Sequence, residues 1–452
     1  MKKNVDLLKG PVLSSLTRLA IPIMATSLIQ MAYNLTDMIW IGRIGSDAVA
    51  AVGAAGMYMW LSNGLASLAK MGCQVNAGYA LGSERKKEAS LYAANALQLS
   101  VILGLIYGLI CSGFNSPLIG FFKLNSPHVI SDARMYLVIT CGFVIFSFLN
   151  QTFTGIFTAI GNSRAAFLAT TAGLLVNIIL DPILIFGIGP FPELNVTGAA
   201  IATVLAQAIV TLMFVCFAMK DSLIFQDIHI FKKPKADYIR SIIHIGLPTS
   251  IQNMLFTGIS MILARFVASY GDAAVSVQKV GSQIESISWM TADGFAAAVN
   301  SFIAQNHGAG NKVRIRKGYT CAMGVVLIWG VICTLLLMLC PALIFRIFIT
   351  EPEILPMGID YLVILGVSQL FMSVEITTAG AFSGYGKTLP PSVNSIIFTV
   401  LRIPLALLLI RTDLGLNGIW WSITISSILK GIVIFTLFFI FLKKERITYV
   451  DK

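Results

Sequence analysis

Residues 136–139 read Tyr-Leu-Val-Ile, and residues 361–364 read Tyr-Leu-Val-Ile again, in a chain of 452 residues. The same offset aligns Gly161-Asn162-Ser163 with Gly386-Lys387-Thr388. The sequence therefore contains two copies of one unit, each close to half of the chain. Internal duplication in an apolar chain is typical of secondary transporters, so the repeat bears on mechanism as well as on fold.

The composition is that of a membrane protein. Hydrophobic residues make up 56% of the chain, charged residues only 12%, and the mean hydropathy is +0.83; soluble domains carry about 25% charged residues. A membrane span needs about 20 mainly apolar residues. We expect twelve spans, beginning near residues 19, 48, 90, 135, 166, 197, 242, 276, 318, 358, 392 and 416. The eighth, within 273–305, is polar and is assigned because it aligns with the second.

Six spans in each copy is an even number, so the second copy enters the membrane from the same side as the first. The sequence therefore predicts an all-α protein with two parallel six-helix bundles, related by a pseudo-two-fold axis along the membrane normal. We expect an N-terminal lobe over residues 1–220, a cytoplasmic linker over 221–240 and a C-terminal lobe over 241–452. The predicted protein is a monomer that passes the cell membrane many times.

The basic residues predict the orientation. The net charge is +11, but the lysines and arginines gather in clusters such as Arg85-Lys86-Lys87, Lys232-Lys233 and Lys443-Lys444. All of these clusters lie on one side if both termini are cytoplasmic, as the positive-inside rule requires. The charge therefore indicates membrane orientation and not nucleic-acid binding. The first span follows a short basic segment without a cleavage site, so it is expected to act as the insertion signal.

No enzyme signature is present in the sequence. There is no phosphate-binding loop and no HExxH motif, so neither ATP hydrolysis nor zinc catalysis is indicated. The seven cysteines lack the paired spacing of a disulfide framework or a metal site. We expect no cofactor, no metal and no enzymatic activity.

Two carboxylates in the first copy have no basic residue one helical turn away. Asp37 lies in the first span beside Asn34 and Thr36, and Asp181 lies in the fifth span four residues after Asn177. Pro182 withdraws an amide from that helix and frees a carbonyl oxygen. Such a group of oxygens suits Na⁺, and a carboxylate alone suits H⁺. The structural alternatives are an interfacial carboxylate at Asp37 and a locally satisfied kink at Asp181. Thr203 in the sixth span by itself reads as a hydroxyl bonded to its own helix.

The second copy has different ionisable residues. A polar and aromatic stripe on one helix face comprises Gln278, Ser282, Glu285, Trp289 and Asp293. It is either the wall of a substrate cavity or a contact between helices. Glu375 and Arg402 are further cavity candidates, although an ion pair between them is the simpler interpretation. By the repeat offset, Arg402 stands where the first copy has Asn177. Pro22 and Pro248 are expected to open the first and seventh spans.

The order and duplication of these motifs resemble the MATE (multidrug and toxic compound extrusion) family, closest to its prokaryotic DinF-like branch. The segments that carry the resemblance are Thr36–Gly42, Gly161–Arg164, Asn177–Pro182, His307–Gly310, Gly380–Lys387 and Arg402–Pro404. The resemblance implies a two-lobed exporter driven by inward H⁺ or Na⁺. It also implies a cation site of Asp37, Asn177, Asp181 and Thr203, with Pro22 at the bend of the first span. A second branch uses acids in spans seven and ten, and the span-seven acid is missing here.

The sequence as a whole predicts a multidrug exporter that antiports amphipathic organic cations against H⁺ or Na⁺ by rocking of its two lobes. The alternative is a flippase for a lipid-linked precursor or another polar lipid, for which Arg402 and Lys430 would supply positive charge. A membrane receptor or a membrane enzyme would need a large extramembrane domain or a catalytic pair, and the sequence indicates neither.

Overall fold

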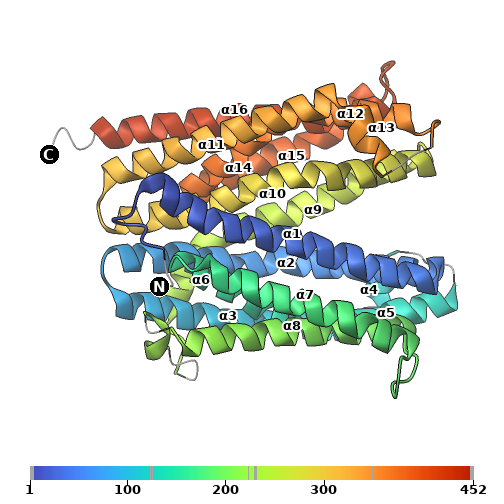
Figure 1. Cartoon of the computed structure of the whole chain (residues 1–452), viewed down its shortest axis with the longest axis horizontal. Helices are drawn as coiled ribbons and strands as arrows, with labels where there is room; N and C mark the ends of the chain where they lie inside the picture. The colour runs from blue at the N-terminus through green and yellow to red at the C-terminus, as the bar shows by residue number, and fades with distance from the viewer. Residues whose placement is uncertain are drawn as a thin grey trace. The chain divides into compact units, whose positions relative to one another are not determined.

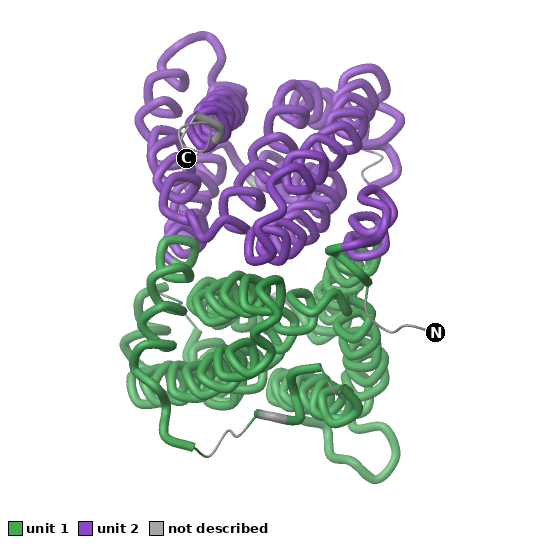
Figure 2. Tube along the Cα trace, turned by 90° about the vertical axis from the view of Figure 1, so that its left-hand side faces the viewer, with its two compact units in different colours: residues 1–8, 21–250 green, residues 9–20, 251–452 purple. Residues whose placement is uncertain are grey.

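The computed structural model describes residues 5–122, 124, 126–221, 223–228, 232–348 and 351–447, which are helical without strands (Figure 1). The chain divides into two compact units. Unit 1 contains residues 1–8 and 21–250, and unit 2 contains residues 9–20 and 251–452 (Figure 2). A continuous helix satisfies its own backbone hydrogen bonds, which is the requirement that a hydrocarbon environment places on a long apolar segment.

The first copy of the repeat forms eight α-helices. They are α1 (Val12–Ile44), α2 (Ser46–Gly82), α3 (Lys86–Gly113), α4 (Asn115–Gly120), α5 (Pro127–Gly142), α6 (Ile145–Ala159), α7 (Ser163–Phe186) and α8 (Asn195–Met219). A single 3₁₀ turn, η1 (Phe225–Asp227), follows α8. The buried apolar residues of unit 1 include Phe157 and Phe214, which stack with ring centroids 5.7 Å apart.

The second copy forms the matching eight α-helices. They are α9 (Ala236–Ala268), α10 (Asp272–Gly308), α11 (Lys312–Leu339), α12 (Pro341–Arg346), α13 (Leu355–Gly366), α14 (Gln369–Gly384), α15 (Leu389–Leu409) and α16 (Leu416–Ile447). Their lengths repeat those of the first copy, since α2 and α10 each have 37 residues and α3 and α11 each have 28. The backbone repeats as well. Gly161 and its counterpart Gly386 both have positive φ, +81° and +73°, a conformation that glycine adopts without strain.

Most of the helices are long and apolar enough to cross a membrane. Eight α-helices of the described residues pass that test singly, and two bent pairs, α5 with α6 and α13 with α14, pass it as broken spans. The remaining long helices, α2 and α10, are the second and eighth spans of the prediction. The sequence prediction singled out only the eighth span as too polar, but α2 is also not apolar enough to pass this test of length and composition. With these two, the helices correspond to the twelve predicted spans.

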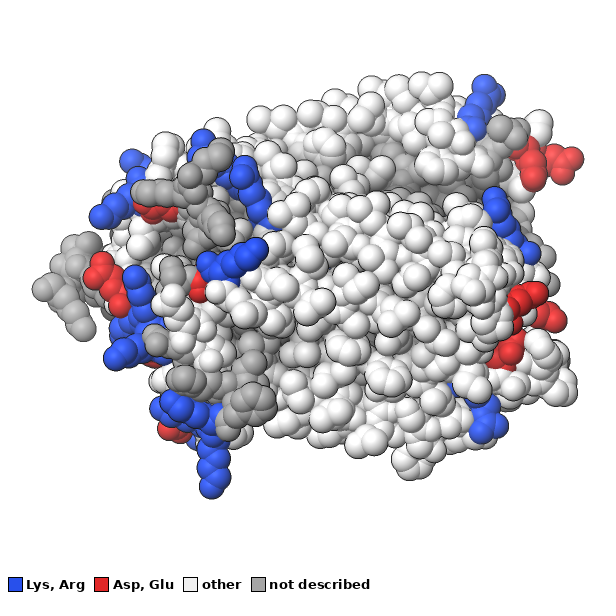
Figure 3. All heavy atoms as spheres, turned by 60° about the horizontal axis from the view of Figure 1, so that its bottom comes forward, with Lys and Arg blue, Asp and Glu red and all other residues white. Residues whose placement is uncertain are grey.

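Charge is segregated along the surface. On the face drawn in Figure 3, lysine, arginine, aspartate and glutamate side chains gather at the two ends, and an uncharged band separates them. Such a band is what a bilayer requires of the surface that it surrounds. The chain is therefore a multi-pass membrane protein by its surface as well as by its helices.

The prediction that Pro22 and Pro248 open their spans is wrong. Helix α1 begins at Val12 and α9 begins at Ala236, so both prolines lie well inside their helices. Each proline is also close to a boundary between the compact units, which falls after residue 20 in α1 and after residue 250 in α9. A proline inside a helix removes one backbone hydrogen bond and weakens the helix locally. Both crossing helices therefore have their weak point close to the place where they pass from one unit to the other.

Candidate ion-coupling site

Helices α1, α7 and α8 of unit 1 bring the four predicted cation-site residues together. Asp37 comes from α1, Asn177 and Asp181 from one face of α7, and Thr203 from α8. Electrostatic proximity links Asp181 to Asp37, and Tyr33 lies beside Asp37, Asp181 and Thr203. The spacing of four residues on α7 allows the Asn177 amide nitrogen to donate to Asp181 Oδ1 over 3.0 Å.

This cluster contains more acceptor oxygens than the protein satisfies. Asn177 and Asp181 are fully buried and Thr203 is 9% exposed. Within the described part of the chain, five buried side-chain oxygens of the cluster have no hydrogen-bond partner: Tyr33 Oη, Asp37 Oδ1, Asn177 Oδ1, Asp181 Oδ2 and Thr203 Oγ1. Buried polar atoms nearly always have partners, so a concentration of unpaired oxygens marks a place where a ligand is expected.

Neither carboxylate is neutralised by a basic residue. Among the described residues, no ion pair within 4.0 Å joins Asp37 or Asp181 to a lysine or arginine. Arg43, the basic residue nearest to Asp37 in sequence, instead covers the ring of Trp40 at 4.7 Å. Two carboxylates within electrostatic range of each other and without a counter-charge repel each other. A proton or a monovalent cation would relieve that repulsion.

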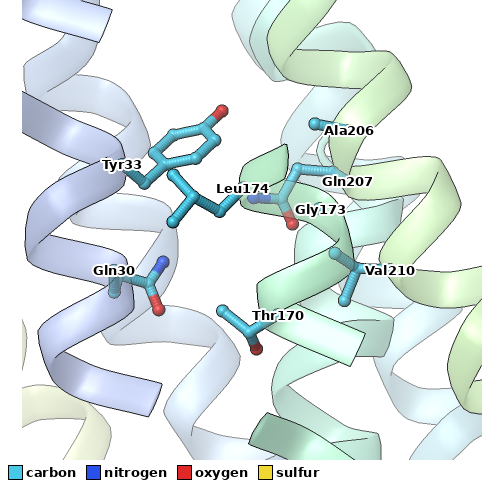
Figure 4. Close-up of a pocket in the computed structure, with 8 residues that line it drawn as sticks. All are labelled: Gln30, Tyr33, Thr170, Gly173, Leu174, Ala206, Gln207 and Val210. Carbon is cyan, nitrogen blue, oxygen red and sulfur yellow. The ribbon is translucent and has the colours of Figure 1, made fainter. Parts of the chain in front are cut away.

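A small pocket adjoins the cluster. Its lining residues come from three helices and are shown in Figure 4: Gln30 and Tyr33 of α1, Thr170, Gly173 and Leu174 of α7, and Ala206, Gln207 and Val210 of α8. The Gln207 side-chain oxygen accepts from Asn150 Nδ2 over 2.8 Å, which fixes part of the wall. Tyr33 lines the pocket and is within electrostatic range of both acids, so the pocket lies next to the carboxylate cluster.

The predicted stripe on α10 of unit 2 does not form one continuous polar surface. Gln278 Oε1 accepts from Trp420 Nε1 over 3.4 Å, and Glu285 Oε2 accepts from the Tyr361 hydroxyl over 3.4 Å. These two residues therefore make contacts between helices. Ser282, Trp289 and Asp293 are exposed instead. The stripe thus splits into a packed part and an exposed part.

The expected ion pair between Glu375 and Arg402 is replaced by another. Glu375 of α14 lies 3.6 Å from the ammonium group of Lys430 on α16. Arg402 of α15 donates to Ser426 Oγ over 2.7 Å and to Ser427 Oγ over 3.2 Å, and it remains within electrostatic range of both Glu375 and Glu285. Sequence spacing alone could not select the partner, because α14, α15 and α16 are separate segments.

Two tyrosines at the site were not among the site residues that the sequence indicated. Tyr33 and Tyr136 both lie beside the two carboxylates and Thr203. A signal for Tyr33 was available, because it precedes Asp37 by one helical turn. Lys430 was considered as a phosphate-binding cation, but its pairing with Glu375 depends on tertiary structure.

Comparisons with known proteins agree with the fold and its duplication. The MatE family model matches residues 22–183 and again residues 248–408. A relative from Thermotoga maritima, named probable multidrug resistance protein NorM, is 29% identical over 440 residues and covers 95% of this chain and 93% of its own. A FAD transporter from Shewanella oneidensis is 25% identical over 442 residues, covering 97% and 96%. A crystal structure of MATE in the bent conformation has a TM-score of 0.90 at 25% identity and covers 99% of both chains.

Proposed function

The chain belongs to the MatE family of membrane transporters, and from that premise we propose that it is a secondary active multidrug exporter. It expels amphipathic organic cations and takes up H⁺ or Na⁺ in exchange. The name of the Thermotoga maritima relative supports export of drugs. The observation that carries the proposal is the concentration of unpaired buried oxygens around Asp37 and Asp181 in unit 1.

In this mechanism the ion and the drug stabilise different arrangements of the same helices. Asp37, Asn177, Asp181 and Thr203 bind the proton or Na⁺. When both carboxylates are charged, their mutual repulsion and the unsatisfied oxygens favour entry of a cation. Pro22 supplies the point in α1 where the helix bends, because its missing amide lowers the cost of bending there.

The orientation is also part of the proposal. Both termini are cytoplasmic in a cell membrane, and the protein acts as a monomer. The clusters of basic residues support this placement through the positive-inside rule.

The flippase alternative has less support. Arg402 and Lys430 would supply the positive charge for the phosphate of such a lipid. The acidic cluster of unit 1, however, would lack a role in moving an anionic head group.

Ethidium efflux from energised cells tests the coupling role of Asp37. We expect Asp37→Asn to abolish gradient-driven efflux, because an amide can neither exchange a proton nor offer a full negative charge to Na⁺. Asp47→Asn, a change to an exposed carboxylate in the first turn of α2, is the matched control and should leave efflux intact. Undiminished efflux by Asp37→Asn would remove Asp37 from the mechanism.

Purified protein in liposomes distinguishes the two ions. A pH gradient and a Na⁺ gradient are imposed separately, and uptake of a fluorescent cation is followed under each. The proposal requires that at least one gradient drives uptake in the wild-type protein and not in Asp37→Asn.

A further inference from the structure

Unit 2 holds two buried cations that the proposed transport cycle does not use. Arg402 is 6% exposed and Lys430 is 4% exposed. Two of the guanidinium N–H groups of Arg402 donate to uncharged serine hydroxyls, so those contacts satisfy hydrogen bonds without cancelling the positive charge. Buried arginine is costly without a carboxylate or phosphate partner, and such groups are typical of functional sites in membrane spans.

The nearest counterion is held loosely. Lys430 Nζ and Glu375 Oε1 are 3.6 Å apart, beyond the usual range of 2.7–2.9 Å for a charge-assisted N–H···O bond. Glu285 is also within electrostatic range of Arg402, but it already accepts a hydrogen bond from Tyr361. Glu375 is therefore the carboxylate shared by the two cations, and its ion pair is long enough to be exchanged for a better one.

An aromatic ring covers both cations. The Arg402 guanidinium carbon lies 5.7 Å from the centre of the Phe256 ring, and Lys430 Nζ lies 6.0 Å from the same centre. Phe256 belongs to α9 and is itself 45% exposed. The ring thus joins an accessible apolar surface to the buried positive charge behind it.

We propose that Arg402, Lys430 and Phe256 form a subsite for an aromatic substrate that carries an acidic group, either a carboxylate or a phosphate. When no substrate is bound, the Glu375 carboxylate occupies the position of that acidic group. The planar guanidinium presents paired N–H donors that match both groups. The ammonium of Lys430 adds a second charge, and the Phe256 ring contacts the apolar part of the ligand. The substrate displaces the Glu375 carboxylate from Lys430.

This inference rests on the proposed transport function and widens its substrate class from organic cations to aromatic compounds with an acidic group. The relative named FAD transporter supports it, since FAD is an aromatic molecule with two phosphates, although that name describes the relative. The subsite also gives unit 2 a role that differs from the coupling role of unit 1.

Binding of FMN and riboflavin to the full chain in phosphatidylcholine nanodiscs tests the subsite. The two flavins share one ring system and differ by a phosphate, so their comparison isolates the acidic group. We expect FMN to bind at least about tenfold more tightly than riboflavin, as a charge-assisted pair of hydrogen bonds predicts. Arg402→Gln and Lys430→Gln should each weaken FMN binding about tenfold and leave riboflavin binding unchanged.

Three controls keep the outcome interpretable. Lys279→Gln removes an exposed lysine of α10 and should change neither affinity. Glu375→Gln removes the internal competitor and should tighten FMN binding. Thermal unfolding identifies a variant that is merely misfolded. If Arg402→Gln is misfolded, Arg402→Lys replaces it, and because lysine keeps the positive charge, this variant should retain part of the preference for FMN over riboflavin.

Phosphatidylglycerol added to the discs distinguishes the two sources of an acidic group. If phosphatidylglycerol abolishes FMN binding to the wild type and leaves the residual binding to Arg402→Gln unchanged, the lipid competes for the subsite. That result would assign the subsite to a lipid head group and support the same chemistry. Equal affinity for FMN and riboflavin in the wild type, or an equal loss of both in the variants, would overturn the proposal. Ethidium efflux by Asp37→Asn is independent of this measurement, so the two proposals can fail separately.

Discussion

The two units share their helices but not their buried charges. Helices α2 and α3 recur as α10 and α11 with the same lengths. Among the described residues, unit 1 has two carboxylates without an ion-pair partner, and unit 2 has two buried cations that share Glu375. The comparison teaches that the two copies keep the same positions for buried polar groups, whereas the charge of those groups, negative or positive, can differ between the copies.

The repeated tetrapeptide illustrates the point. Tyr136 of the first copy lies beside Thr203 and both carboxylates of unit 1. Its counterpart Tyr361 donates to Glu285, which lies in the electrostatic range of Arg402. Each copy therefore places the same tyrosine at its polar centre, although the ions around it differ.

The largest expected effect comes from giving unit 1 the cation of unit 2. Asn177 and Arg402 are equivalent by the repeat, so Asn177→Arg places a guanidinium beside Asp181. The fixed cation would neutralise the carboxylate pair and compete with H⁺ or Na⁺. We expect loss of all gradient-driven ethidium efflux.

The reciprocal change, Arg402→Asn, is the control for that variant. It alters the equivalent position of unit 2 and should leave efflux of ethidium, which has no acidic group, within about threefold of wild type, an effect below 1 kcal/mol. If both variants lost efflux equally, the division of roles between the units would be wrong.

The second expected effect concerns stability and has opposite signs in the two units. Glu375→Gln leaves Lys430 buried without its carboxylate, which should lower the free energy of unfolding by about 3–5 kcal/mol. Asp181→Asn removes a buried charge that has no counterion and should raise it by about 1 kcal/mol. Thermal and denaturant unfolding of the purified variants measures both, and a destabilised Asp181→Asn would indicate that the carboxylate is paired.

The sequence predicted the architecture because hydropathy and duplication are local signals. Apolar runs located the spans. The repeat identified α10 as a span, although its own composition is too polar for it to be recognised by hydropathy. The grouping of Asp37, Asn177, Asp181 and Thr203 came from the resemblance to a family, and the structure brings these residues together. The pairing of Lys430 with Glu375 could not be predicted from the sequence, because whether Glu375 pairs with Arg402 or with Lys430 depends on how α14, α15 and α16 pack.

The misplaced prolines have a different cause. Pro22 and Pro248 were assigned to span starts because hydropathy falls towards the polar ends of α1 and α9. The helices continue beyond the apolar part, from Val12 and from Ala236. Helix boundaries follow backbone hydrogen bonding, and hydropathy reports only the part that a bilayer would cover.

A smaller effect should be equal in both units, because it concerns the scaffold. Gly198 and Gly418 lie near the starts of the equivalent helices α8 and α16, 220 residues apart. An added Cβ at Gly198 would lie 2.3 Å from the Leu184 carbonyl oxygen, and one at Gly418 would lie 2.7 Å from the Leu409 carbonyl carbon. Gly198→Ala and Gly418→Ala should each cost about 1–3 kcal/mol of unfolding free energy through overpacking. Gly53→Ala, where no atom lies within 4 Å, is the control. A large difference between the two variants would show that the shared scaffold is not equally tight.

The smallest expected effect separates a binding hydroxyl from a structural one. Thr203 in unit 1 and Thr399 in unit 2 are both buried, and the hydroxyl of each lacks a hydrogen-bond partner among the described residues. Valine has nearly the same shape as threonine, so Thr203→Val and Thr399→Val should both retain stability.

If the Thr203 oxygen contributes one neutral ligand, its loss should raise the H⁺ or Na⁺ concentration for half-maximal transport about fivefold, a loss of about 1 kcal/mol. The Thr399→Val protein should keep the wild-type ion dependence, because no pair of unneutralised carboxylates surrounds that hydroxyl. An equal shift of the half-maximal ion concentration in both variants would mean that an unsatisfied buried oxygen affects transport wherever it lies. That result would contradict the assignment of the ion site to Asp37 and Asp181.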